Sequence, residues 1–345
     1  MQYETYTNRD CLRASFDAAL EEQQNIVLQA GSLRDPARSF AKSVCEGLRK
    51  TPRQLECRFL YDARGSELYE QICDQPEYYL TRTEAAILQQ YAADISKRTG
   101  PCHLIELGSG SSVKTDYLLS AYQANYTNVC YTPIDISATA LTLAGRAIIK
   151  KRPSVQVVGI HGTYNDSFQL LGCSSPELVI FLGSTLGNFS EEEEHAFWRD
   201  IADQMQTGDY LLLGVDLVKE IALLEAAYND AAGVTAAFTK NYFARMNREL
   251  GTSLDLDHIR HVAFFNPEKS RVEIFVEFTR AQKIHIGSLQ QTFPVAAKER
   301  LRIEISRKFH LPAVQDTLGS YGFEPVKSYT DDKGWFGLIL FRKSS

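Results

Sequence analysis

The chain has a short apolar run, a glycine loop and the start of a helix at residues 103–118, which read His103-Leu-Ile-Glu-Leu-Gly-Ser-Gly-Ser-Ser-Val-Lys-Thr-Asp-Tyr-Leu118. Gly108 and Gly110 let the backbone turn tightly after a strand and approach a ligand closely. The helix start that follows offers backbone N–H groups without a helical partner, which suit a polar ligand. The stretch therefore predicts a nucleotide-type binding loop at the carboxyl end of a strand.

The apolar run before this loop is the first of five of the same kind. They read HLIEL, NVCYTPIDI, VQVVGIH, ELVIFLG and DYLLLGVDL, and the segments between them are mostly long enough for a helix. Short runs without alternation, separated by helical spacers, are typical of parallel strands buried on both faces. We therefore predict an α/β fold with a doubly wound sheet. Residues 37–50 and 84–96 show helical spacing, and the first eighty residues are predicted to be mainly helical.

The second half of the chain has a different pattern. Residues 261–287 alternate apolar and polar side chains around a turn at Asn266-Pro-Glu-Lys269, which predicts an antiparallel meander. Residues 323–328 and 335–342 flank the polar turn Asp331-Asp-Lys-Gly334. We expect a terminal hairpin there, able to add antiparallel strands to the edge of the main sheet.

Composition excludes several classes of protein. The chain has 345 residues, 44% apolar and 23% charged, with a net charge of −6, which fits a folded protein and argues against a nucleic-acid partner. No apolar run approaches the roughly 20 residues of a membrane span, and the first residues do not resemble a signal peptide, so we expect a cytoplasmic protein without membrane contact. The seven cysteines are scattered without a CxxC pair, so neither a disulfide framework nor a metal site is expected.

The glycine loop favours one kind of ligand. Val113 stands where a GxGxxG dinucleotide fingerprint has its third glycine, whereas the pattern Glu106-x-Gly108-x-Gly110 fits S-adenosylmethionine better. Asp135 ends the next strand, where a carboxylate could bind ribose hydroxyls or cap the following helix. Further candidate cofactor residues are Lys114 at the helix start and Gly162, Thr163 and Tyr164 after the third strand.

The fourth strand runs into Phe181-Leu-Gly-Ser-Thr-Leu-Gly-Asn188. Its carboxyl end faces the crevice where open α/β sheets bind ligands, so Asn188 could contact a substrate, although asparagine before a helix is also a common cap. Glu191 to Glu194 are predicted to complement the positive end of a helix and not to bind a metal.

Several motifs together resemble a known family. They are Phe59-Leu-Tyr-Asp-Ala-Arg-Gly-Ser66, Pro76-Glu-Tyr-Tyr-Leu-Thr-Arg82, Glu106-Leu-Gly-Ser-Gly110, Gly183-Ser-Thr-Leu-Gly-Asn188, Asp216-Leu-Val-Lys219, Ala226-Ala-Tyr-Asn-Asp230 and Glu304-Ile-Ser306. The chain resembles the L-histidine Nα-methyltransferases of ergothioneine biosynthesis, which make histidine betaine (hercynine) from histidine and S-adenosylmethionine. The resemblance runs in order through nearly the whole chain.

The resemblance implies a Rossmann-like class I methyltransferase domain joined to a second α/β domain for substrate recognition. It implies that Glu304 and Ser306 bind the imidazole, that Asn188 and Tyr228 hold the α-carboxylate, and that Tyr78 and Tyr61 lie near the reacting amine. From the sequence pattern and the resemblance we assign residues 61–215 and 306–345 to the first domain, and residues 1–60 and 216–305 to the second. The expected partners are histidine and its N-methylated forms, with the protein acting as a monomer.

The residues themselves are consistent with this assignment but leave other readings open. Glu304 and Ser306 stand two apart, so in an extended segment their side chains share a face, although Glu304 could instead pair with Arg302 or Lys308 at the surface. Two departures from the family occur, Thr163-Tyr164 in place of Asp-Phe in some relatives, and Leu80 in place of a proline. The alternatives are methylation of tyrosine or tryptophan, a nucleotide-dependent oxidoreductase, or a metabolite-binding protein without turnover.

Overall fold

The chain folds into two compact units in a computed structural model that describes residues 1–6, 9–30, 35–172 and 176–344. The first unit comprises Met1–Arg34, Arg82–Leu217 and Phe309–Ser345, and the second comprises Asp35–Thr81 and Val218–Lys308. This division differs from the expected one in two places. Residues 1–34 lie with the main sheet because two short strands pair at its edge, and residues 61–81 lie in the second unit.

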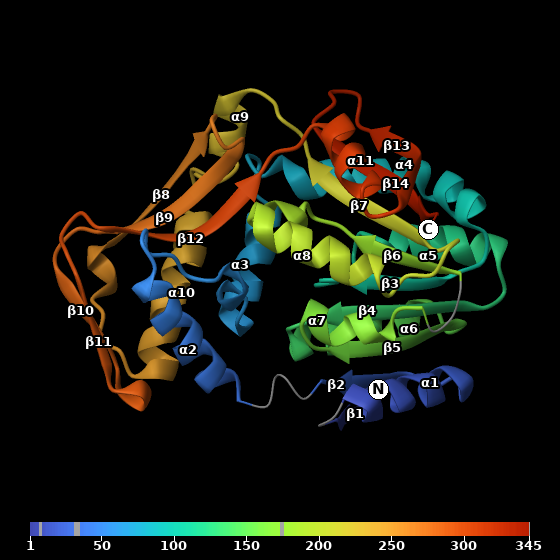
Figure 1. Cartoon of the computed structure of the whole chain (residues 1–345), viewed down its shortest axis with the longest axis horizontal. Helices are drawn as coiled ribbons and strands as arrows, with labels where there is room; N and C mark the ends of the chain where they lie inside the picture. The colour runs from blue at the N-terminus through green and yellow to red at the C-terminus, as the bar shows by residue number, and fades with distance from the viewer. Residues whose placement is uncertain (7–8, 31–34, 173–175, 345) are drawn as a thin grey trace. The chain divides into compact units, whose positions relative to one another are not determined.

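The first unit is built on a nine-stranded sheet in the order β1-β2-β5-β4-β3-β6-β7-β14-β13 (Figure 1). The strands from β1 to β7 are parallel, while β14 runs antiparallel to both β7 and β13. Their bounds are β1 Gln2–Thr5, β2 Ile26–Gln29, β3 His103–Leu107, β4 Val129–Asp135, β5 Val155–His161, β6 Glu177–Phe181, β7 Tyr210–Asp216, β13 Phe323–Thr330 and β14 Phe336–Lys343. The predicted doubly wound sheet and the terminal hairpin at its edge are confirmed.

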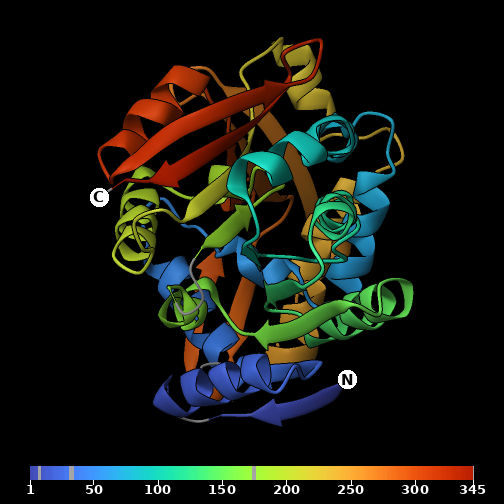
Figure 2. The ribbon, with the colours of Figure 1, turned by 90° about the vertical axis from the view of Figure 1, so that its right-hand side faces the viewer.

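Helices connect and cover these strands. They are α1 Arg9–Glu21, α4 Tyr79–Thr99, α5 Thr115–Asn125, α6 Ala138–Lys151, α7 Tyr164–Ser167, α8 Glu191–Ala202 and α11 Leu311–Gly319, with short 3-10 turns η3 Phe168–Leu170 and η4 Thr185–Asn188. The central strands β3 and β6 are buried at every position, as their apolar runs predict. Figure 2 shows α11 lying along the hairpin of β13 and β14.

The second unit has a three-stranded antiparallel sheet in the order β12-β9-β8 and a separate hairpin of β10 and β11. The strands are β8 Ile259–Asn266, β9 Arg271–Phe278, β10 Gln282–Ile286, β11 Gln291–Val295 and β12 Arg300–Arg307. Its helices are α2 Pro36–Arg49, η2 Cys57–Leu60, α3 Ala63–Cys73, α9 Ile221–Ala226, α10 Val234–Leu250, η5 Leu256–His258 and η6 Gly287–Leu289. Asp35 caps α2 by accepting a hydrogen bond from the backbone of Arg38, and Pro36 fits the first helical turn.

The predicted meander is correct for β8 and β9, but β10 leaves their sheet. The reason is that β9 already has a neighbour on each side, β8 on one edge and β12 on the other. Strand β10 therefore pairs with β11 instead. Sequence alternation identified β10 as a strand, but it carries no information on which edge is free.

Candidate functional site

The glycine loop begins directly after β3, at the edge of the sheet where all its parallel strands end. Gly108 has φ +72°, and its N–H donates to Ile134 O at the end of β4, at 2.8 Å. A Cβ at Gly108 would lie 2.8 Å from the hydroxyl of Tyr164, so both the backbone conformation and the space require glycine. Gly110 also has a positive φ, and a Cβ there would meet open space. The loop thus presents its backbone at an open edge.

Glu106 supports this loop from within the unit. Its carboxylate accepts hydrogen bonds from Thr115 Oγ1, at 2.7 Å, and from the hydroxyl of Tyr131, which also bonds to Ser112 at 2.9 Å. Burial raises the pKa of Glu106 to about 7, against the opposing effect of the two hydroxyl donors. The side chain is therefore placed to hold the loop and the start of α5.

Asp135, at the end of β4, joins two segments. One carboxylate oxygen accepts from Gly110 N and the other from Ser137 N, both at 2.8 Å. Ser137 is the cap of α6, because its side chain accepts from Ala140 N. Ser137, and not Asp135, is therefore the cap residue of α6, while the Asp135 carboxylate holds the glycine loop. Ribose binding by Asp135 stays a prediction. Burial raises the pKa of its carboxyl.

Gly162, Thr163 and Tyr164 lie beside Asp135, since Gly162 N donates to Asp135 O at 3.1 Å. Thr163 donates through its backbone N and its hydroxyl to Asp166, at 2.8 and 2.6 Å, and so starts α7. The ring of Tyr164 packs at 5.6 to 6.4 Å from the aromatic rings of Phe181, Phe189 and Phe197. The structure therefore places this triplet beside Asp135 and, through Tyr164, beside Gly108, and its contact with a cofactor stays a prediction.

Lys114 is tied to a residue that the sequence did not single out. Its ammonium donates to Glu84 on α4, and Glu84 also accepts from Gly183 N at 2.8 and 3.0 Å. Glu84 is fully buried, and a Cβ on Gly214 would overlap its carboxylate. The available signal was its spacing, because Glu84 shares the apolar face of α4 with Ile87, Leu88 and Ile95.

Asn188 ends η4, the turn that follows β6 at the same edge of the sheet as the glycine loop. The turn is built on Ser184, which has φ +55° and whose hydroxyl accepts from Asp216 N at 2.9 Å. Asn188 is half-buried. The next helix, α8, has Ser190 and Glu193 as a capping box, so the predicted role of the acidic run at a helix start is confirmed. Among the described residues, no cluster of three or more His, Cys, Asp or Glu could hold a metal.

In the second unit, three polar side chains meet in a buried cluster. The hydroxyl of Tyr228 donates to Ser306 Oγ at 2.7 Å, and Lys308 Nζ donates to Ser306 Oγ at 2.8 Å and to the Tyr228 hydroxyl at 3.0 Å. Ser306 lies on β12, opposite Val272, and Glu304 lies two residues before it, half-buried and opposite Ile274. The alternation predicted for Glu304 and Ser306 therefore holds, on the stretch after a bulge between Arg302 and Glu304.

Aromatic rings extend from this cluster. The ring of Tyr78 lies 6.2 Å from that of Tyr228 and 6.4 Å from that of Tyr69, and Tyr69 lies 5.5 Å from Tyr61. Burial raises the pKa of Tyr78 well above its usual value. Its phenol is therefore neutral at physiological pH and suited to hydrogen bonding. Tyr69 was missed by sequence reasoning, because a tyrosine in a helix carries no signal of its own.

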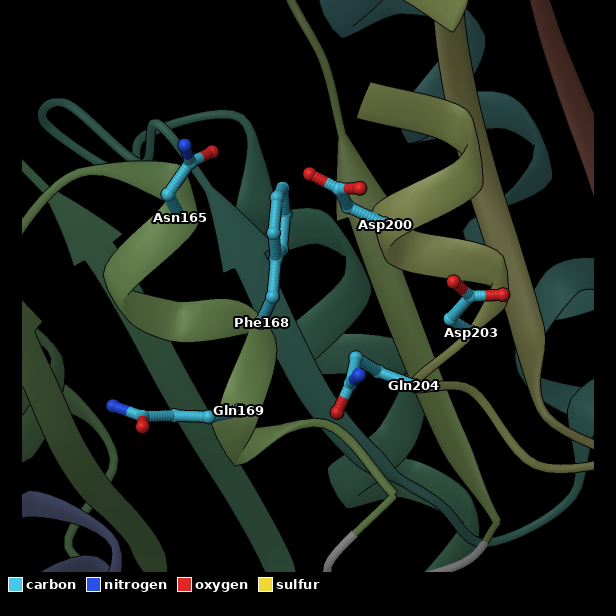
Figure 3. Close-up of a pocket in the computed structure, with 6 residues that line it drawn as sticks. All are labelled: Asn165, Phe168, Gln169, Asp200, Asp203 and Gln204. Atoms are coloured by element: carbon cyan, nitrogen blue, oxygen red, sulfur yellow. The ribbon is translucent and has the colours of Figure 1, made fainter. Parts of the chain in front are cut away.

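A separate polar pocket in the first unit contains none of the predicted site residues. It has a volume of about 250 Å³ and is lined by Asn165, Phe168, Gln169, Asp200, Asp203 and Gln204. Figure 3 shows Phe168 between the short helix α7, which carries Asn165, and α8, which carries Asp200. The predicted site residues lie in two groups, one at the loops after β3 to β6 of the first unit and one around β12 in the second unit.

A doubly wound sheet with an antiparallel hairpin at one edge and an ExGxG loop after its central strand is the architecture of Rossmann-like class I methyltransferases. The family model described as "Histidine-specific methyltransferase, SAM-dependent" matches residues 40–343. The chain belongs to this family. It is an enzyme of the S-adenosylmethionine-dependent methyltransferase class, and the resemblance found in its motifs is confirmed.

Curated relatives extend over most of the chain. The histidine N-alpha-methyltransferase of Mycolicibacterium smegmatis is 40% identical over 304 residues, covering 88% of this chain and 95% of the relative. That of Mycobacterium tuberculosis is 37% identical over 305 residues, with the same coverage of both chains. The 4-dimethylallyltryptophan N-methyltransferase of Claviceps purpurea is 28% identical over 322 residues, covering 85% of this chain and 92% of the relative.

Proposed function

We propose that this protein transfers methyl groups from S-adenosylmethionine to the α-amino nitrogen of L-histidine, giving hercynine as the first step of ergothioneine biosynthesis. The observation that carries the proposal is the match to a histidine-specific family over residues 40–343, with two histidine N-alpha-methyltransferases at 40% and 37% identity. Glu304 and Ser306, on one face of β12, supply a carboxylate and a hydroxyl that suit the two nitrogens of an imidazole.

The first unit fits the cofactor. Gly110 leaves room for close approach to the backbone, and Asp135 and Gly162 meet beside the loop. When bound, S-adenosylmethionine supplies an electrophilic methyl group on its sulfonium sulfur. We assign its binding to Glu106, Gly108, Gly110, Lys114, Asp135, Gly162, Thr163 and Tyr164, of which Glu106 acts by holding the loop.

For the amino acid, Asn188 is proposed to hold the α-carboxylate, while Tyr78 and Tyr61 orient the amine. Tyr228, which the family resemblance also places near the carboxylate, gives its only hydroxyl proton to Ser306. The α-amino group of histidine is mostly protonated at neutral pH. A proton must therefore leave the nitrogen before each transfer, so that its lone pair can attack the methyl group. The neutral phenol of Tyr78 can accept or donate a hydrogen bond at the amine without itself becoming charged. Positioning of the amine for in-line attack should then supply most of the rate enhancement.

We further propose that the enzyme works as a monomer in the cytoplasm, without a nucleic-acid partner. The net charge of −6 argues against binding a phosphate backbone. The six cysteines in the described part of the chain are free thiols, which fits a reducing compartment. No helix within the described ranges is long and apolar enough to cross a membrane.

A second candidate is the same chemistry on tryptophan or tyrosine. The relative that methylates a prenylated tryptophan covers nearly as much of the chain as the histidine enzymes do, and this observation supports the alternative. The discriminating experiment is a competition in which the protein and S-adenosylmethionine are given all twenty amino acids. We expect histidine to be consumed first. Preferential consumption of tryptophan or tyrosine would replace histidine as the substrate, and no methyl transfer to any amino acid would refute the proposal.

A further inference from the structure

A buried ammonium group, that of Lys308, contacts the hydroxyl of Ser306 in the second unit. Lys308 is only 3% exposed, and its Nζ lies 2.8 Å from Ser306 Oγ and 3.0 Å from the Tyr228 hydroxyl. Burying a lysine is unfavourable unless its charge is well solvated by protein groups. The buried cation of Lys308 therefore needs a functional explanation.

The hydrogen bonds of the cluster have a fixed direction. An ammonium can only donate, so both hydroxyl oxygens must accept where they meet Lys308. Tyr228 gives its own proton to Ser306, at 2.7 Å. The Ser306 oxygen therefore accepts from Lys308 and from Tyr228, and these two bonds use both of its lone pairs. The remaining hydrogen-bonding capacity of Ser306 is its own proton, so the hydroxyl is set to act as a donor.

The backbone holds Lys308 in this position. Lys308 N donates to Ser270 O at 2.8 Å, and Ser270 Oγ donates to Lys308 O at 3.1 Å. Glu304, Ser306 and Lys308 follow one another at a spacing of two along β12 and its end. One segment thus carries an acceptor, a hydroxyl, and the cation that orients that hydroxyl.

We propose that Lys308 is a positioning residue for substrate selectivity: it holds Ser306 as a hydrogen-bond donor, so that the site binds a ring with one donor and one acceptor nitrogen. The inference rests on the proposed function, because it takes Glu304 and Ser306 to be the residues that contact the imidazole. Glu304 accepts from the N–H of a neutral imidazole, and Ser306 donates to the other nitrogen. Indole and phenol rings have no ring nitrogen that can accept from Ser306.

The test compares Lys308→Met and Lys308→Gln with Ser306→Ala, the corresponding double variants and the wild type. Methionine removes the donor, whereas glutamine is polar and can both donate and accept, so neither forces Ser306 to donate. Lys308→Met and Lys308→Gln should each raise KM for histidine about tenfold or more. The change in kcat should be smaller, and the affinity for S-adenosylhomocysteine should not change. Lys308→Arg, which keeps a donor-only cation, should recover part of the loss.

Because Lys308 acts through Ser306, the effects of Lys308→Met and Ser306→Ala on KM should not be additive. In the Ser306→Ala background, Lys308→Met should raise KM much less than it does in the wild type. Lys343→Met is the matched control. Lys343 is also a buried lysine, 6% exposed, but it lies in the first unit and donates to Tyr321 O. That variant should keep the wild-type KM.

Three results would overturn the inference while leaving the proposed function intact. They are an unchanged KM in folded Lys308→Gln or Lys308→Met, additive effects of Lys308→Met and Ser306→Ala, and an equal rise of KM in Lys343→Met. If Lys308→Met does not fold, the glutamine variant decides. A wild-type protein that does not methylate histidine would instead refute the proposed function.

Discussion

Glu304 is the residue with the most specific expected contact to the substrate. If its carboxylate accepts the imidazole N–H, Glu304→Ala removes a charge-assisted hydrogen bond worth about 1.5 to 3 kcal/mol, or roughly tenfold to more than a hundredfold in histidine affinity. The substitution should also reduce the preference for histidine over tryptophan, because it removes a half-buried group that favours an imidazole and leaves more space for an indole ring. The measurement is the ratio of kcat/KM values for the two amino acids.

Glu268→Ala provides the control for this prediction, because Glu268 is an exposed acid in the turn between β8 and β9 of the same sheet. Its selectivity should equal that of the wild type. An unchanged ratio in Glu304→Ala, with S-adenosylhomocysteine affinity preserved, would show that Glu304 does not contact the imidazole.

Glu106 predicts a dependence of stability on pH. Its folded pKa of about 7 lies above the value of about 4.3 in an unfolded chain. Between these pH values Glu106 keeps a proton in the folded protein that it releases in the unfolded chain. The contribution of Glu106 to the free energy of unfolding therefore falls as pH rises, by on the order of 3 kcal/mol. Glu106→Gln removes this contribution. The Tm of the wild type minus that of the variant should therefore be larger at pH 5 than at pH 8, and an equal difference would contradict the assignment.

The site residues differ in how well the sequence alone identifies them. Gly108, Gly110 and Asp135 follow strands in patterns with a physical meaning, and the structure brings them together. Glu84 shares the spacing of an apolar helix face, but neither it nor Lys308 belongs to a pattern with a chemical meaning, because a charged side chain becomes informative only when its burial is known. The roles of Glu304 and Ser306 came from the family resemblance, and their spacing alone also fitted a surface strand.

At the scale of elements, α4 links two loops through one side chain. Glu84 accepts from Lys114 after β3 and from Gly183 after β6, so it fixes the glycine loop and the start of the turn that carries Asn188. Removing the carboxylate leaves a partly buried ammonium without this partner, a change that typically destabilises by about 3 to 5 kcal/mol.

We therefore expect Glu84→Ala to lower Tm and to weaken S-adenosylhomocysteine binding, with Glu84→Gln intermediate because its amide oxygen can still accept from Gly183 N. Titration calorimetry and thermal melting are the measurements. A matched control is Glu191→Ala, an exposed acid in the first turn of α8. Donor affinity equal to the wild type in folded Glu84→Ala would show that the loops hold their places without it.

The strands of the main sheet were predictable where they are long and buried on both faces, as from β3 to β7. Strands β1 and β2 have four residues each and were missed, because so short a run gives no usable period. Their pairing at the sheet edge, through β2 and β5, is what moves residues 1–34 out of the expected second domain.

For the whole molecule, ligand binding should separate the possible classes of protein. A ligand that binds only the native state stabilises it by about 2.7 kcal/mol at a hundred times its Kd. S-adenosylmethionine and S-adenosylhomocysteine should therefore raise Tm, and NAD should not. Stabilisation by NAD alone would indicate an oxidoreductase, and stabilisation by the methyl donor without turnover would indicate a metabolite-binding protein.

Fragmentation mass spectrometry of the reaction product shows whether the methyl groups go to the α-nitrogen of histidine. The protein is incubated with histidine and an excess of S-adenosylmethionine. We expect a trimethylated product that releases trimethylamine on fragmentation and retains an unmodified imidazole. Methyl groups on the imidazole, or no methylated histidine at all, would contradict this expectation.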